Sequence, residues 1–139
     1  MFDLIHSIDS VELAEALNEQ ARRSDKVQKV LVQVKLAPEE TKHGIEKKAL
    51  FRCLDRLVGL KNLKIEGLMT IPPFFDDPKM SRPYFRELRD MRDEAEEKGF
   101  PVKELSMGMT NDFEVAIEEG ATIVRIGTAI FGERKKEAI

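Results

Sequence analysis

Apolar residues gather in five short runs along the chain, and patterns typical of helices separate them. Rich in Ile, Val and Leu and bounded by turn residues, the runs predict β-strands at 2–8, 29–36, 63–71, 103–109 and 121–127. Between the runs, apolar positions recur at spacings of three and four, as in helices that bury one face. Strands that alternate with helices predict a parallel sheet with helices packed outside it.

Several residues mark where the predicted helices begin and end. Asp9 and Glu12 form a capping box for the first helix. Residues 45–58 carry the apolar pattern of the second. Pro83 suits the first turn of the third helix, and Gly99 ends that helix.

The strand predicted at 29–36 has two unlike faces. Its alternate apolar positions, which we expect to face the helices, are Val30, Val32, Val34 and Leu36. Gln33 and Lys35 then lie on the opposite face, toward the carboxyl end of the strand, where barrels build their sites. The same alternation turns Arg125 toward that end of the sheet. Arg125 is then either a structural partner of a neighbouring acid or a donor aimed at a ligand.

Two of the predicted strands end in turns of small residues that open the next segment. One turn covers 106–111, where Asn111 begins a helix, and the other is Gly127-Thr128. Backbone N–H groups at such turns bind phosphate, and (β/α)8 barrels commonly hold phosphate after strands 7 and 8. Each turn alone is typical of an ordinary strand–helix junction, but two adjacent ones together predict a phosphate site.

Composition and charge exclude several classes of protein. The 139 residues suffice for one domain, and the net charge of −3 carries no nucleic-acid footprint. No apolar run approaches the roughly 20 residues that span a membrane, and no signal peptide is visible. Cys53, the single cysteine, lies at a core position and favours a reducing compartment, the cytoplasm. His6 has no second histidine or cysteine on a neighbouring strand, so no metal site is predicted.

Six segments spread along the whole chain resemble the pyridoxal phosphate homeostasis protein family. They are His-Ser-Ile-Asp at 6–9, Val-Leu-Val-Gln-Val at 30–34, Glu-Glu-Thr-Lys-His-Gly at 39–44, Gly-Leu-Met-Thr-Ile-Pro-Pro at 67–73, Leu-Ser-Met-Gly-Met-Thr-Asn-Asp at 105–112 and Val-Arg-Ile-Gly-Thr-Ala-Ile-Phe-Gly at 124–132. That family is a single barrel related to the barrel domain of alanine racemase, the fold type III class. The resemblance therefore implies an α/β fold, here a partial (β/α)8 TIM-type barrel.

The resemblance also implies a cofactor, pyridoxal 5'-phosphate, and a role in its intracellular homeostasis without catalysis. The positions that it assigns to the cofactor are Ser106, Met107, Gly108, Met109, Thr110, Arg125, Gly127, Thr128, His6 and Met69. The two turns would border the phosphate, and Arg125 would face the pyridine nitrogen and keep it unprotonated. His6 and Met69 would lie near the ring. No residue is assigned a catalytic role, and none is assigned to a metal.

The chain departs from the family in its length. A complete barrel has eight strands and typically about 250 residues, whereas the five strands here are expected to match the fourth to the eighth. The family's Schiff-base lysine lies on an earlier strand, and no lysine here matches its motif, so binding is expected to be noncovalent or weak. Lys35, where the family often has Asn, could in principle capture an aldehyde.

Three accounts of this incomplete single domain, residues 1–139, stay open. The chain is a fragment of a full barrel protein, a half that assembles with its own copy or a missing N-terminal partner, or a truncated phosphate-binding module. Competing functions are a racemase-like or other phosphate-handling enzyme and an assembly module with open sheet edges. Tyr84, the single tyrosine, lies at a predicted helix start, which argues against a racemase-like base.

Overall fold

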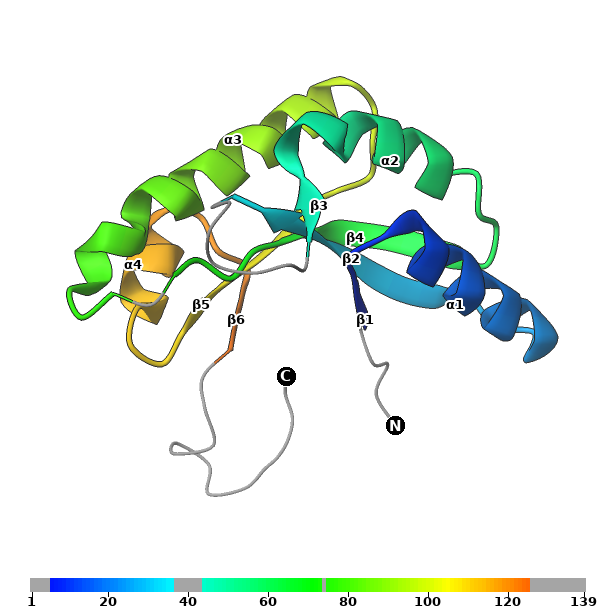
Figure 1. Cartoon of the computed structure of the whole chain (residues 1–139), viewed down its shortest axis with the longest axis horizontal. Coiled ribbons are helices and arrows are strands. Elements are labelled where there is room, and N and C mark those ends of the chain that lie inside the picture. Colours follow the sequence, from blue (N-terminus) through cyan, green and yellow to red (C-terminus); the bar gives the residue numbers. More distant parts are fainter. Residues whose placement is uncertain (1–5, 37–43, 74, 126–139) are drawn as a thin grey trace, which may run out of the picture.

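A parallel sheet with helices on one face makes up the structure, a computed structural model that describes residues 6–36, 44–73 and 75–125 (Figure 1). The strands are β1 (His6–Ile8), β2 (Gln28–Lys35), β3 (Ile45–Glu46), β4 (Leu63–Met69), β5 (Glu104–Met109) and β6 (Ile123–Arg125). The α-helices are α1 (Val11–Arg23), α2 (Leu50–Leu57), α3 (Arg82–Glu97) and α4 (Phe113–Glu118), and the 3-10 helices are η1 (Lys47–Ala49) and η2 (Pro78–Ser81).

Neighbouring strands pair in the order β1-β2-β4-β5-β6, and every pair is parallel. Each of the five predicted strands overlaps one of these strands, so the predicted α/β class and parallel sheet are confirmed. β3 was not predicted. It extends the edge of β2 for two residue pairs, Val34 with Ile45 and Lys35 with Glu46.

Two predicted helix starts are wrong, for local reasons. Ser10, not Asp9, caps α1, because the Ser10 Oγ accepts the N–H of Leu13 at 3.1 Å. The helix predicted over 45–58 begins only at Leu50. Ile45, which fitted the helical pattern, is instead buried in β3 against the end of β2.

The hydrophobic core lies between the sheet and the helix layer. Its buried members include Val30, Val32, Val34, Leu36, Leu54, Leu57, Phe85 and Leu88. The predicted apolar face of β2 is therefore confirmed, and Cys53 packs against this core as expected. Fully burying one such Leu or Phe side chain contributes about 1.5–3 kcal/mol. Pro83 lies in the first turn of α3, also as predicted.

An irregularity in β4 determines which of its side chains point to the face of the sheet opposite the helices. The pairing with β2 passes from Val30–Ile65 to Leu31–Gly67, so Glu66 is an extra residue, as in a β-bulge. A side chain at Gly67 would place its Cβ 2.0 Å from the Glu104 carbonyl oxygen, so the close approach of β5 requires glycine. The bulge leaves Leu68 in the core. Met69, the next residue, then lies on the opposite face.

Candidate ligand-binding site

The sheet face opposite the helices brings Arg125 together with residues from two other strands. The Arg125 Nη2 lies 3.4 Å from the Ser7 Oγ of β1 and 3.1 Å from the Met69 Sδ of β4. β1 and β6 stand at the two ends of the strand order. In Figure 1 both end strands turn away from the helix layer, so the sheet arches and this face is concave. Arg125 therefore reaches across the arch, on the face that the alternation predicted.

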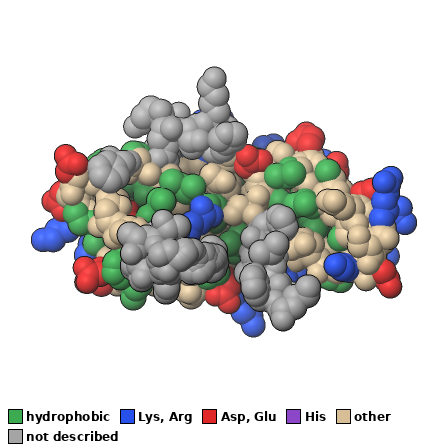
Figure 2. Space-filling view, turned by 90° about the horizontal axis from the view of Figure 1, so that it is seen from below, with side chains coloured by type: hydrophobic (Ala, Val, Ile, Leu, Met, Phe, Trp, Pro, Cys, Tyr) green, Lys and Arg blue, Asp and Glu red, His purple; other side chains and the backbone are tan. Residues whose placement is uncertain are grey.

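Figure 2 shows the molecule from this side. Hydrophobic side chains gather over the middle of the view, with a Lys or Arg side chain among them. Two of the residues on this face, Leu31 and Met69, are only 4% and 2% exposed. This side of the sheet therefore combines buried apolar side chains with a half-buried cation, Arg125.

Arg125 is half-buried, and burial lowers the pKa of its guanidinium from the ordinary value. Within residues 6–36, 44–73 and 75–125, no carboxylate forms an ion pair with it. The structural ion pair that the sequence left open thus has no partner among these residues. A guanidinium keeps its charge in proteins, so a ligand group that accepts hydrogen bonds can meet it here.

The end of β5, which leads into the next turn, depends on Gly108. Its φ is +102°, a left-handed conformation, and a Cβ there would lie 2.6 Å from the Ala116 Cβ in α4. Only glycine therefore lets the end of β5 pass this close to α4. Ser106 and Met107 are both buried, and the Met107 side chain lies in the helix-side core. Of Met107, the backbone is thus the part that could border a ligand.

The N–H groups of this turn are only partly available for an anion. The Met109 N–H donates to the Asp112 Oδ1 at 2.7 Å, and the Asp112 N–H donates to the Met109 carbonyl oxygen at 3.1 Å. Asp112, not Asn111 as predicted, is the N-cap residue of the six-residue α4. The Asn111 Nδ2 instead donates to the Phe75 carbonyl oxygen at 3.2 Å. The Met109 N–H is therefore already bonded to Asp112 in this structure.

Other predicted site residues are placed only in part. His6 lies in β1 opposite Val30 of β2, and its side chain lies outside the described part of the chain. Gly127 and Thr128 also lie outside the described residues. Thr110 is exposed and is the first residue of the turn after β5. The structure thus brings Arg125 and Met69 together and leaves the second predicted phosphate turn undescribed.

Sequence reasoning missed two residues of this region, Ser7 and Asp112. Ser7 alternates with the buried Ile8 and so belongs to the concave face, a signal that the strand pattern contained. Asp112 follows Met109 by three residues, the spacing at which a side-chain carboxylate can bond a turn N–H. Both were visible in the sequence, but their partners were not.

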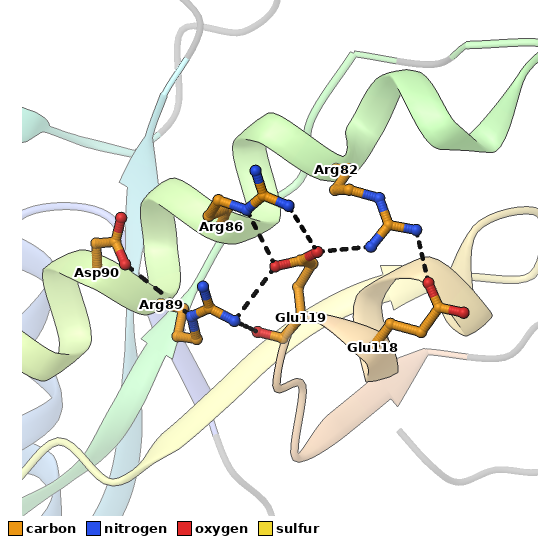
Figure 3. Close-up of polar contacts among 6 residues, drawn as sticks. All are labelled: Arg82, Arg86, Arg89, Asp90, Glu118 and Glu119. Carbon is orange, nitrogen blue, oxygen red and sulfur yellow. Dashed lines mark hydrogen bonds and ion pairs between the residues drawn. The ribbon is translucent and has the colours of Figure 1, made fainter.

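A cluster of arginines on α3 binds the C-terminal end of α4 (Figure 3). The buried Glu119 carboxylate, at the end of α4, lies 2.6 Å from Arg82 and 3.2 Å from both Arg86 and Arg89. Hydrogen bonds from Arg86 and Arg82 lower the pKa of Glu119. Arg82 also reaches Glu118 at 2.6 Å. The cluster therefore holds the segment that leads from the turn after β5 to Arg125.

A cavity of about 340 Å³ lies at the end of β2 and is lined by Lys35, Leu36, Glu46, Lys47 and Lys48, but not by Arg125. No group of three or more His, Cys, Asp or Glu side chains suited to a metal occurs among the described residues. The helices in that part of the chain are each too short or too polar to cross a membrane.

The chain is similar to proteins of known family along nearly its whole length. The model of the alanine racemase N-terminal domain matches residues 1–135. A pyridoxal phosphate homeostasis protein of Aquifex aeolicus is 52% identical over 133 residues, which are 95% of this chain and 58% of that protein. Its counterpart in Vibrio cholerae is 41% identical over 133 residues, 96% of this chain and 56% of that protein.

Among solved structures, PipY of Synechococcus elongatus with pyridoxal phosphate bound superposes with a TM-score of 0.84 at 37% identity. The match covers 94% of this chain and 61% of PipY. The chain thus spans somewhat over half the length of these relatives. It belongs to the alanine racemase N-terminal domain family, and the relatives matched here are named pyridoxal phosphate homeostasis proteins.

Proposed function

We propose that this chain binds pyridoxal 5'-phosphate without covalent attachment and serves its intracellular homeostasis, in the cytoplasm. One observation carries the proposal. The Arg125 guanidinium is half-buried on the concave face beside Met69, and it pairs with no carboxylate among the described residues. An unpaired cation in such surroundings is costly unless a ligand group accepts its hydrogen bonds. Relatives named for this cofactor, and PipY, whose structure contains it, support the choice of ligand.

The residues present fit the cofactor in two ways. The charge of Arg125 favours an unprotonated pyridine nitrogen, because its own N–H groups need an acceptor. The turn after β5 lies close to Arg125, because β5 is the neighbour of β6 and its last residue, Met109, pairs in register with Arg125. We assign the phosphate to this turn and the end of β5, where Gly108 keeps the backbone free of a side chain, together with Gly127 and Thr128. His6 and Met69 would border the ring.

Bound pyridoxal phosphate would supply an aldehyde and a ring that withdraws electrons. Arg125 opposes the second property, since it leaves the nitrogen unprotonated. We therefore infer that the chain holds the cofactor and does not use it for turnover. We further propose that the five paired strands correspond to the later strands of the barrel formed by the longer relatives.

Equilibrium dialysis with pyridoxal 5'-phosphate and with pyridoxal tests the proposal. We expect saturable binding of the phosphate ester, and weaker binding of pyridoxal because it lacks the phosphate. Arg125→Leu should weaken binding, whereas Arg52→Leu, which removes an exposed charge from α2, should not. Equal binding of both ligands, or no effect of Arg125→Leu, would contradict the proposal.

Borohydride treatment followed by intact-mass measurement tests the noncovalent part. We expect no added mass. A stoichiometric adduct on Lys35, which lines the cavity at the end of β2, would show that this chain captures the aldehyde covalently.

A further inference from the structure

Ser7 lies far from Arg125 in the strand order but touches it on the concave face. Ile8 is fully buried in the helix-side core, so Ser7, its neighbour in β1, points to the opposite face. β2, β4 and β5 stand between β1 and β6 in the sheet. The 3.4 Å contact between the Ser7 Oγ and the Arg125 Nη2 is therefore possible only because the sheet arches.

The guanidinium is thereby held from one side. Both of its contacts with described residues, Ser7 and Met69, use the Nη2 atom. Within those residues, the Nε and Nη1 groups of Arg125 have no acceptor. A planar guanidinium that is fixed at one nitrogen presents its remaining N–H groups in a defined direction.

We propose that Ser7 is a positioning residue of the ligand site, which orients Arg125 so that its other N–H groups face the ring nitrogen of a phosphorylated pyridine. This inference rests on the proposed function. A hydroxyl suits the task because it accepts a hydrogen bond without neutralising the cation, as a carboxylate would. The Met69 thioether is a weak acceptor, so Ser7 supplies the one oxygen acceptor of the two contacts.

The effect of Ser7 must then depend on the ring nitrogen of the ligand. Pyridoxine 5'-phosphate and its 1-deaza analogue, in which carbon replaces that nitrogen, separate this effect from general loss of structure. The alcohol ligand also avoids reaction with lysines. Isothermal titration of both ligands into the full chain and its Ser7 variants gives the comparison.

We expect Ser7→Ala to weaken binding of pyridoxine 5'-phosphate by about 3- to 10-fold, the range of one ordinary hydrogen bond. Binding of the deaza analogue should stay unchanged. Ser7→Thr keeps a hydroxyl on a strand residue and should restore binding. Ser10→Ala is the matched control, because it removes the cap of α1 and lowers stability without touching Arg125.

Equal weakening of both ligands by Ser7→Ala would reduce Ser7 to a structural role and overturn the inference. No effect on either ligand would overturn it as well. In both cases the wild-type chain still binds, so the proposed function stands. If the wild-type chain binds neither of the two ligands, the proposed function is overturned, and the inference with it.

Discussion

Replacing Gly108 by alanine tests how closely the end of β5 packs against α4. Two costs add at this position. A side chain at a φ of +102° costs about 1–3 kcal/mol in backbone strain. A Cβ only 2.6 Å from the Ala116 Cβ and 3.3 Å from the Phe113 Cα adds overpacking of about 1–3 kcal/mol. The sum of about 2–6 kcal/mol is a large part of the 5–15 kcal/mol typical of whole domains.

Gly99→Ala is the matched control. Gly99 has a similar φ of +95°, but no atom lies within 4 Å of a Cβ built there. It should therefore show the strain without the clash. In urea unfolding followed by circular dichroism, we expect Gly108→Ala to lose about 1–3 kcal/mol more than Gly99→Ala, with unchanged m-values. Equal losses in the two variants would refute the proposed contact between the end of β5 and α4.

Three further predictions concern the segment between the turn after β5 and Arg125. Glu119→Gln should lower the urea midpoint of unfolding clearly more than Glu118→Gln, because Glu119 is buried among three arginines whereas Glu118 is exposed. Equal shifts of the midpoint would contradict the role of the arginine cluster. The lowered pKa of Glu119 gives a stabilisation that is present above about pH 4.5 and lost as the pH falls through the folded-state pKa. The stability gap between wild type and Glu119→Gln should therefore shrink below pH 4.5, and a gap that stays constant would disprove this origin. Asp112→Ala should cost about 1–3 kcal/mol because it removes the acceptor of the Met109 N–H, while Asp112→Asn, which keeps an oxygen acceptor, should cost less in the same unfolding assay.

Local sequence patterns predicted the sheet because they reflect burial directly. The alternation of Val30, Val32 and Val34 has one physical cause, a strand with one face against helices. The ends of helices were harder to predict from the sequence, because neighbouring residues can serve equally well as the cap. Ser10 and Asp9 can both cap a helix, and only the backbone conformation, extended at Ser10, decides between them.

The contacts of the site depend on tertiary geometry that a local pattern does not contain. Arg125 and Ser7 are separated by 118 residues. Their meeting requires the arch of the whole sheet. The bulge at Glu66 likewise shifts Met69 to the concave face, and it arises in the pairing of two strands that are distant in the sequence. The pattern could therefore predict which face Arg125 joins, but not which side chains hold it there.

A crystal structure of this chain with pyridoxal 5'-phosphate tests the central claim most directly. The account predicts the ring on the concave face, with its nitrogen within hydrogen-bond distance of the Arg125 guanidinium and its phosphate at the turn after β5. A ligand bound elsewhere, or bound on this face without contact to Arg125, would contradict it.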